Sequence, residues 1–270
     1  MDPQLAALRA VMASMPSALV CFSGGVDSAF VLKVAHDVLG DRALGLTALS
    51  PALPTDERAE AGALARELGV AHALVDSHEI DDPNYVANPV NRCYFCKSEL
   101  YTVAQREARA RGFAVILNGT NLDDLGDHRP GLDAAREAGV RSPLVEAGFT
   151  KADVRRCAQL VGLRVWDKPA AACLASRIPY GTSVTHERLR QIDRAESAIR
   201  ALGIRQLRVR YHDRLARVEV AQPEMDRAFA LRQEIAAACR AAGFAYATLD
   251  LEGYRLGSHN EVVRLKVLNA

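Results

Sequence analysis

A short apolar run that leads into a glycine turn near the start of the chain is the feature that most constrains its fold. The run ends at Phe22, the turn reads Ser-Gly-Gly-Val-Asp-Ser over residues 23–28, and a helical apolar pattern follows over 29–35. Glycines let the backbone approach an anion closely, and the first N–H groups of a helix point toward it. A strand, a glycine turn and a helix in this order predict a phosphate site, to which Ser23 and Ser28 add hydroxyl donors.

The alternative is an ordinary turn between a strand and a helix that happens to carry two glycines. The turn also differs from a Walker-type loop, because no Gly-Lys-Ser or Gly-Lys-Thr follows it. Without that lysine, nothing in the loop is placed at the outer phosphates in the usual way. The site is therefore open to a different cleavage of the nucleotide.

The first 165 residues alternate between strand and helix patterns. After the first strand, we expect strands over 43–49, 70–75 and 113–117, and helices over 4–14, 27–40, 55–68, 93–111 and 151–161. This alternation is typical of βαβ units. We predict an α/β fold for residues 1–165, with a parallel twisted sheet and helices on both faces.

A long irregular stretch over 166–184 separates this domain from a smaller unit. It holds the single tryptophan and Cys173, and irregular segments of this length are usually functional or disordered. Residues 185–270 are expected to form an α+β domain for substrate binding or oligomerisation. Its expected elements are helices over 185–202 and 223–241 and strands over 205–211, 214–221 and 245–251.

The composition limits the partners of the chain. Its 270 residues carry a formal net charge of +1, so no general attraction to nucleic acid or to an anionic membrane is expected. No run of about 18 apolar residues is present to cross a bilayer, and the N-terminus lacks a secretory pattern. We expect a cytoplasmic location, where six cysteines are better explained by chemistry or core packing than by disulfides.

Cysteines in apolar strand or helix patterns are interpreted as core residues: Cys21, Cys157 and Cys239. Cys93 and Cys96 differ, because they lie three residues apart at an expected helix start beside Lys97, a setting that favours thiolates. Alone, the pair is compatible with half a zinc site, a redox dithiol or an iron–sulfur pair.

Cys173 lies on the irregular stretch, close to Arg177. A cysteine on an ordered loop beside a cation is a better nucleophile candidate than one in a core. The alternative is an incidental loop thiol.

Four segments together resemble the LarE family, the ATP-dependent sulfurtransferases that mature the nickel-pincer nucleotide cofactor of lactate racemase. They are 23–28, 118–121 with Asp124, Asp127 and Arg129, 168–181 around Cys173, and the run Leu-Asp-Leu-Glu-Gly-Tyr-Arg over 249–255. The glycine turn alone is shared by N-type ATP pyrophosphatases in general. The Cys-Leu-Ala-Ser-Arg and Gly-Tyr-Arg runs are more specific. The resemblance implies an adenine nucleotide alpha hydrolase-like fold.

The resemblance implies ATP and Mg²⁺ as cofactors and pyridinium-3,5-biscarboxylic acid mononucleotide as the substrate. AMP transferred from ATP to a carboxylate releases pyrophosphate, and a sulfur nucleophile then displaces AMP. The nucleotide is assigned to Ser23, Gly24, Gly25, Ser28, Lys97, Asn118, Gly119, Thr120 and Asp124, and Mg²⁺ to Asp27. A homo-oligomer and transient contact with other cofactor-maturation proteins are also implied.

The segment after strand 113–117 should lie close to the glycine turn. Ligands of a parallel sheet lie beyond the carboxyl ends of its strands, so residues 118–124 are expected to face the turn across one crevice.

The substrate's phosphate and carboxylates need cations. Arg177, Arg208 and Arg210 are the candidates, and 208 and 210 share one face of an expected strand. Glu196, on the preceding helix, is expected to pair with one of these two or to hold a metal. The alternative is a solvated face with a salt bridge.

Two sulfur donors remain open. Family members with only the equivalent of Cys173 give up that sulfur, which leaves dehydroalanine. Members with three such cysteines bind a [4Fe-4S] cluster, whose open iron carries an extra sulfide. We predict that Cys93, Cys96 and Cys173 ligate such a cluster.

Two other functions compete with this one. A tRNA-thiolating pyrophosphatase uses the same turn and three cysteines, but it would be expected to carry a basic RNA-binding face. A module that binds ATP without cleaving it is the non-enzymatic alternative, and pyrophosphate release separates it from the sulfurtransferase.

Overall fold

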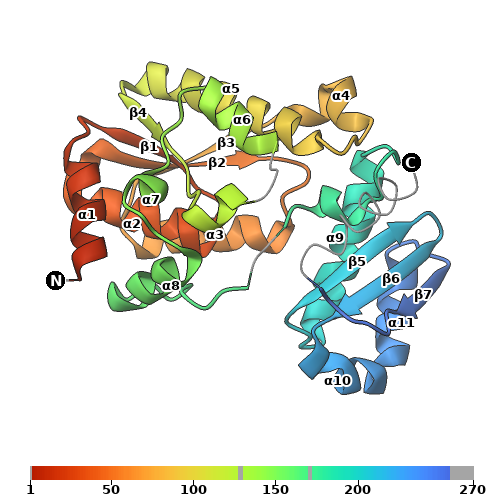
Figure 1. Ribbon diagram of the computed structural model, residues 1–270. Helices are drawn as coiled ribbons and strands as arrows, with labels where there is room; N and C mark the ends of the chain where they lie inside the picture. The colour runs from red at the N-terminus through yellow and green to blue at the C-terminus, as the bar shows by residue number, and fades with distance from the viewer. Residues whose placement is uncertain (1, 127–129, 170–171, 256–270) are drawn as a thin grey trace. The chain divides into compact units, whose positions relative to one another are not determined.

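The computed structural model describes residues 2–126, 130–169 and 172–255, which form two compact units (Figure 1). The first unit comprises Met1–Ser50, Thr55–Glu79 and Asn91–Ala171, and the second comprises Pro51–Pro54, Ile80–Val90 and Ala172–Ala270. No helix in the described ranges is long and apolar enough to cross a membrane.

A four-stranded parallel sheet forms the centre of the first unit. Its strand order is β3-β2-β1-β4, from β1 (Ala18–Cys21), β2 (Ala43–Leu49), β3 (His72–Asp76) and β4 (Val115–Leu117). Strand β1 is central because its residues are apolar on both faces, as the strands of a covered parallel sheet are. The predicted α/β fold with a parallel sheet is confirmed.

Helices cover both faces of this sheet (Figure 1). Ala18 and Val20 of β1 face a core with α1 (Pro3–Ala13), α2 (Val26–Leu39), α3 (Thr55–Glu67), α7 (Pro143–Glu146) and α8 (Lys151–Leu160). Leu19 faces the opposite core, which α5 (Arg92–Arg111) and α6 (Pro130–Glu137) cover. Alternation along one strand thus builds two apolar layers.

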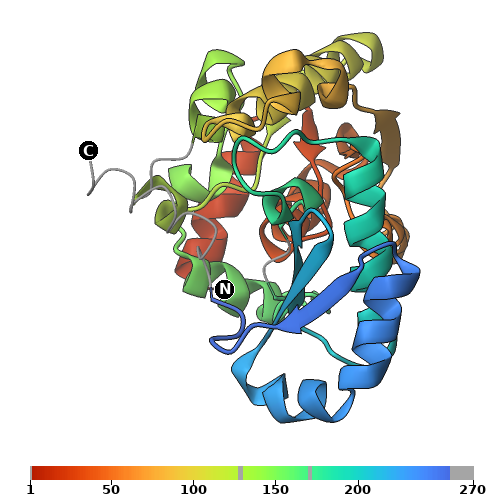
Figure 2. The same ribbon diagram turned by 90° about the vertical axis from the view of Figure 1, so that its right-hand side faces the viewer.

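The second unit contains a three-stranded mixed sheet of order β5-β6-β7. Strands β5 (Leu207–His212) and β6 (Leu215–Val220) are antiparallel, and β7 (Tyr246–Leu249) pairs with β6 in parallel. Helices α9 (His186–Ala201) and α11 (Arg232–Ala241) pack on each other and on this sheet (Figure 2). The smaller α+β unit expected from the sequence is therefore present.

Three segments differ from the expected elements. The helix expected over 223–241 is divided into α10 (Met225–Ala230) and α11, because Leu231 leaves the helical backbone at φ −91° and ψ 18°. Residues 77–91, whose polar and proline-bearing sequence predicts a loop, contain the four-residue helix α4 (Pro83–Val86). Helices α6 and α7 were not expected; both are short and begin at a proline, which is well tolerated at a helix start.

Candidate functional site

The glycine turn lies at the carboxyl end of β1 and leads directly into α2. Gly24 has φ +75°, which favours glycine, and a Cβ built on it would lie 3.1 Å from Ala61 Cβ on α3. No side chain of the described residues caps the fourteen-residue helix α2 at Gly25. An uncapped helix start presents its amide groups and its positive dipole end to an anion.

The serine hydroxyls of the turn bond to one another. Ser23 Oγ and Ser28 Oγ are 3.2 Å apart, Ser23 N donates to Ser28 Oγ at 3.2 Å, and Ser28 Oγ lies 3.2 Å from the Gly25 carbonyl oxygen. These bonds hold the turn in its curved form. Their predicted role as phosphate donors stays a prediction.

The segment after β4 packs directly on the start of α2. A Cβ built on Gly119 would lie 2.8 Å from Ser28 N, so any side chain there would collide with the helix backbone. Asn118 Oδ1 accepts from Thr120 N at 3.1 Å and from Ser142 Oγ at 2.9 Å, which fixes the loop. The expected closeness of this segment to the glycine turn is confirmed.

Asp27, in the first turn of α2, has a basic partner that the sequence did not predict. Lys151 Nζ pairs with Asp27 Oδ2, and Asn121 Nδ2 donates to Asp27 Oδ1 at 3.3 Å. Asp124 Oδ2 in turn accepts from Asn121 N at 3.1 Å. Asp27 and Asp124 therefore belong to one polar cluster at this edge of the sheet.

A second lysine supports the turn from outside. Lys168 Nζ donates to the Gly24 carbonyl oxygen at 3.3 Å and forms ion pairs with Glu57 at 2.7 Å and Glu60 at 2.6 Å. Burial alone would raise the pKa of Glu60, but the hydrogen bonds and charges of Lys168 and Arg164 lower it. Lys168 thus ties the turn to the first turns of α3.

The Cys93–Cys96 pair lies on the first turn of α5. Cys93 is exposed and Cys96 is partly buried. Burial tends to lower the pKa of Lys97, but its interactions with Tyr101 and with the thiols of Cys96, Cys21 and Cys93 raise it overall. The lysine ammonium is therefore favoured among these sulfur atoms.

Cys21 differs from the other two cysteines interpreted as core residues. Cys157 and Cys239 are fully buried in helices, as expected. Cys21 is only partly buried at the end of β1, and desolvation raises the pKa of its thiol to about 12. The positive charge of the neighbouring Lys97 tends to lower the pKa of this thiol.

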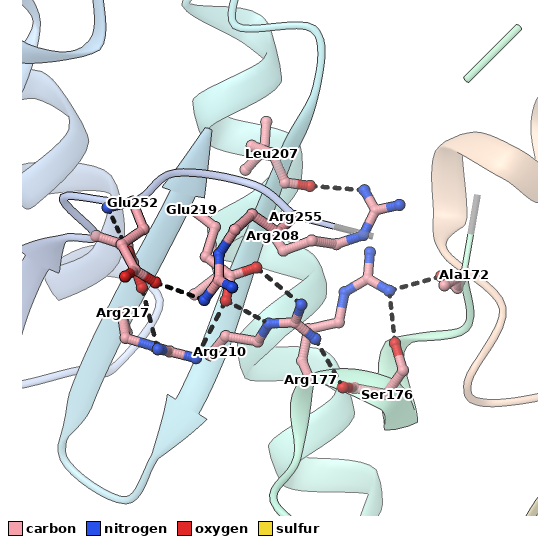
Figure 3. A network of polar contacts seen from close by, with 12 residues as sticks. Ala172, Ser176, Arg177, Leu207, Arg208, Arg210, Arg217, Glu219, Glu252 and Arg255 are labelled. Carbon is pink, nitrogen blue, oxygen red and sulfur yellow. Dashed lines mark hydrogen bonds and ion pairs between the residues drawn. The ribbon is translucent and has the colours of Figure 1, made fainter. Parts of the chain in front are cut away.

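In the second unit, Cys173 is exposed and precedes the short 3₁₀ helix Leu174–Arg177. Arg177 Nη1 donates to the Ala172 carbonyl oxygen at 2.7 Å (Figure 3). It also donates to the Cys173 carbonyl oxygen at 2.9 Å. Its Nε and Nη2 bind the Glu196 carboxylate at 2.8 and 3.0 Å, with both side chains buried. Arg177 therefore fixes the backbone around Cys173.

Glu196 has three donors: besides Arg177, Arg200 Nη2 binds it at 2.7 Å and Val209 N at 2.9 Å. Burial raises the pKa of Glu196, but the charges and hydrogen bonds of these groups outweigh it and hold the pKa below its ordinary value. The carboxylate is a structural anchor between α9 and β5.

Arg208 and Arg210 are both buried on β5. Arg210 forms a bidentate pair with Glu219 at 2.9 and 2.8 Å and donates to the Ser176 carbonyl oxygen at 3.0 Å (Figure 3). Arg208 Nη1 donates to the Leu207 carbonyl oxygen at 2.7 Å, and its guanidinium lies 5.0 Å from the Tyr254 ring centre. Burial, with the neighbouring charge of Arg177, lowers the pKa of Arg208.

Cationic groups concentrate around strand β5 in the second unit. The guanidinium groups of Arg177, Arg208, Arg210 and Arg255 gather in Figure 3, with Glu219 and Glu252 as acidic partners. Arg177, Arg208 and Arg210 are buried, whereas Arg255 is exposed, and guanidinium groups this close to one another favour a bound anion.

The predicted site residues divide between the two units. The nucleotide residues and the Cys93–Cys96 pair belong to the first unit, and Cys173 belongs to the second. Within the described residues, no three His, Cys, Asp or Glu side chains gather as a metal-binding group. Asp127 and Arg129 lie outside the described residues.

The chain is similar to known proteins over almost its whole length. It is 38% identical over 259 residues to the pyridinium-3,5-bisthiocarboxylic acid mononucleotide synthase of Lactiplantibacillus plantarum, covering 96% of this chain and 94% of the relative. The chain belongs to the LarE family. No protein-family model matches it.

Two further relatives extend the comparison for this LarE family member. An uncharacterized protein of Synechocystis, slr1717, is 47% identical over 97% of this chain and 99% of the relative. The uncharacterized protein MJ0830 of Methanocaldococcus jannaschii is 28% identical over 63% of this chain and 66% of the relative. Family membership thus agrees with the resemblance inferred from the motifs.

Sequence reasoning missed Lys151 and Lys168 as partners of the glycine turn in this LarE family member. Lys151 is 124 positions from Asp27, and Lys168 is 144 positions from Gly24. One signal was available for Lys168, since it begins a segment that matches the family. Lys151 lies inside the capping box formed by Thr150 and Asp153, and this motif marks only a helix start.

Proposed function

We propose that the chain is an ATP-dependent sulfurtransferase that replaces a carboxylate oxygen of pyridinium-3,5-biscarboxylic acid mononucleotide with sulfur. Family membership supports this reaction, because the L. plantarum relative is named for making the corresponding bisthiocarboxylic acid. The observation that carries the proposal is the glycine turn at the uncapped start of α2, against which the loop after β4 packs.

ATP would bind at the carboxyl end of the first unit's sheet. The amides of the turn, at Gly24 and Gly25, suit the phosphates, and the loop at Asn118–Thr120 lies directly beside them. The close approaches at Gly24 and Gly119 support this fit, since a Cβ at either position would meet its neighbour. Asp27 is the residue proposed to hold Mg²⁺, and its carboxylate is partly exposed.

The chemistry requires activation because hydroxide is a poor leaving group. A carboxylate oxygen of the substrate attacks the α-phosphorus of ATP, which forms an acyl-adenylate and releases pyrophosphate. A sulfur nucleophile then attacks the acyl carbon, and AMP leaves with the electron pair of the broken C–O bond. The product is a thiocarboxylate.

The arginines of the second unit would bind the anionic groups of the substrate. Buried carboxylates of Glu196 and Glu219 pair with Arg177 and Arg210. Burial and the charge of Arg177 lower the pKa of Arg208, and the charge of Glu196 acts in the opposite direction. An anion bound here would interact favourably with these guanidinium groups, so we assign the substrate contact to Arg177, Arg208 and Arg210 together.

Two sulfur donors are consistent with these residues. Cys93 and Cys96 lie one helical turn apart, so both thiolates could ligate one cluster, with Cys173 of the second unit as the third ligand. A bound [4Fe-4S] cluster with three thiolate ligands would supply an open iron for an extra sulfide. Alternatively, Cys173 Sγ attacks the acyl-adenylate, and β-elimination then releases the thiocarboxylate and leaves dehydroalanine.

Product analysis tests the function. The purified chain is incubated with the dicarboxylate mononucleotide, MgATP and sulfide, and AMP, pyrophosphate and thiocarboxylate are measured. Equal formation of all three supports the proposal. ATP binding without pyrophosphate release would indicate a non-catalytic module, and activity that requires tRNA would indicate a tRNA-thiolating enzyme; either result overturns the proposal.

Metal analysis separates the two sulfur donors. After anaerobic reconstitution, the cluster predicts bound iron and sulfide in the wild type and their loss in Cys93→Ser and Cys96→Ser. A chain that binds no iron, and whose Cys173 loses the mass of H₂S after one turnover, would show that this cysteine is the donor. Cys239→Ser is the matched control, since that thiol is buried.

A further inference from the structure

We propose that Asn88 is a positioning residue for the loop that carries Cys173, and that its side-chain amide holds this loop in the conformation used for sulfur transfer. Residues 172–184 are named the cysteine loop. Asn88 and the cysteine loop both belong to the second unit. This role rests on the proposed sulfurtransferase function, because it requires Cys173 to supply sulfur or to ligate the cluster.

The backbone of Asn88 has an unusual conformation in a fully buried place. Its φ of +54° is left-handed, which residues other than glycine rarely adopt, and it directly precedes Pro89. Among the described residues, the other non-glycine residue with a positive φ is Asp213, on the exposed turn between β5 and β6. Asn88 is instead 0% exposed. A strained residue persists only where its contacts determine its conformation, so those contacts indicate its role.

Carbonyl oxygens of the cysteine loop surround the side-chain amide of Asn88. Its Nδ2 donates to Pro179 O at 2.8 Å and to Thr182 O at 2.9 Å, with a longer bond of 3.3 Å to Ile178 O. Carbonyl oxygens only accept hydrogen bonds, so a donor is required at this position. The backbone adds a further bond, since Gly181 N donates to Asn88 O at 3.0 Å. One residue therefore holds this turn of the loop by both its side chain and its backbone.

The part of the loop around Cys173 is held by other bonds. Leu174 N donates to Ala52 O at 2.8 Å, and Arg177 Nη1 donates to Cys173 O at 2.9 Å. Ala52 and Leu174 also belong to the second unit. Cys173 therefore lies in a segment that is anchored on one side by Ala52 and on the other side by Asn88.

Loss of the Asn88 amide should change the reactive conformation of the loop. The carbonyl oxygens of Pro179 and Thr182 would each lose a donor, which favours a different conformation of the turn. Displacement of a reacting group by about 1 Å is able to slow a reaction about a hundredfold. Sulfur transfer should therefore slow, whereas ATP binding at the first unit's glycine turn should not change.

Two variants separate the amide from the backbone conformation. Asn88→Gly tolerates the left-handed backbone and removes the amide. Asn88→Asp keeps the size of the side chain and places carboxylate oxygens against the carbonyl oxygens of the loop. Asp213→Gly is the matched control, because it also places glycine at a left-handed position, φ +53°, but on an exposed turn.

The activity test uses the dicarboxylate mononucleotide, MgATP and sulfide, each at saturating concentration. Thiocarboxylate formation should slow at least about tenfold in Asn88→Gly and more in Asn88→Asp. The dissociation constant of ATP, measured by isothermal titration calorimetry, should stay within about twofold of the wild type. Asp213→Gly should match the wild type in both measurements. A rate for Asn88→Gly equal to the wild type would overturn the inference.

Hydrogen exchange followed by mass spectrometry reports on the loop without any activity. In the wild type, Gly181 N donates to Asn88 O and Val184 N donates to Val86 O at 2.9 Å, so peptides over 178–184 should be protected. Asn88→Gly should speed their exchange at least about tenfold, and peptides from β6 less than about twofold. An unprotected loop in the wild type, or equal acceleration in β6, would overturn the inference, because the second result indicates general destabilisation.

The outcomes separate this role from the proposed function. If the wild type forms no thiocarboxylate, the proposed function fails. If the wild type is active and Asn88→Gly loses ATP binding as strongly as sulfur transfer, only the inference fails. Circular dichroism checks the fold of each variant. Failure of Asn88→Gly to fold would also overturn the inference, since Asn88 would then be required for the fold itself.

Discussion

Replacement of Glu196 with glutamine should destabilise the second unit strongly. The Glu196 side chain is fully buried and accepts hydrogen bonds from Arg177, Arg200 and Val209. The variant removes the negative charge and keeps the size of the side chain. It leaves the Arg177 guanidinium, which is 1% exposed, without its counter-charge.

The size of the expected loss in unfolding free energy follows from the burial of Arg177 and Glu196. Removal of one partner from a buried ion pair costs about 3–5 kcal/mol, because the other charge stays buried and uncompensated. Arg177 keeps its bonds to the carbonyl oxygens of Ala172 and Cys173, and glutamine keeps one carbonyl acceptor. We therefore expect the low end of this range, about 3 kcal/mol.

The loss of stability in Glu196→Gln should depend on pH in a defined direction. Burial raises the pKa of Glu196, but Arg177, Arg200 and the Val209 amide hold it below its ordinary value of 4.5. A carboxyl with a lowered folded pKa stabilises the fold above its unfolded pKa, and this contribution is lost as the pH falls through the folded pKa. The difference between wild type and Glu196→Gln should thus be constant from neutral pH to about 4.5 and narrow at lower pH.

Urea denaturation followed by circular dichroism measures this difference. Glu252→Gln is the control, because its pair with Arg255 at 2.5 Å is exposed and should contribute less than about 1 kcal/mol. A loss of less than about 1 kcal/mol for Glu196→Gln, or one equal to the control, would refute the reasoning from burial.

Two other variants test the first unit. Gly24→Ala should cost at least about 1–2 kcal/mol and weaken ATP binding, because φ is +75° and the new Cβ would lie 3.1 Å from Ala61 Cβ; Gly69→Ala, at φ +66° with open space, should lower stability and leave ATP affinity unchanged in the same titration. Thr150→Ala should cost about 1 kcal/mol in urea denaturation. It should also raise the NMR-measured pKa of Asp153 from about 2 toward 3.8, since the Thr150 hydroxyl bond is the largest cause of the lowering. An unchanged pKa would contradict this cause.

Much of the first unit could be predicted from the sequence because its signals are local. Apolar runs and helical periods alternate along the chain, and a parallel sheet places the ends of its strands at one edge. This is why the closeness of the segment at Gly119 to the start of α2 could be expected from the sequence alone.

The supporting lysines could not be predicted in the same way. Lys151 and Lys168 reach the glycine turn from α8 and from the segment after it, and no local pattern links a lysine to a turn more than 120 positions away. The pairing of Arg177 with Glu196 has the same origin, since two elements must pack before the charges meet. Long-range ion pairs form only where distant elements pack together. The periodic patterns that reveal helices and strands do not show which elements pack on one another.

The contact between Gly24 and Ala61 also restricts how this chain is able to vary. Ala61 lies on α3 and carries no group that could react or bind a phosphate, yet its Cβ and backbone occupy the space beside the turn. Any larger side chain at position 61 would push on the loop at Gly24. A residue with no chemistry of its own is therefore under the same selection as the proposed nucleotide site, and small residues at this position in related chains would be a signature of that site.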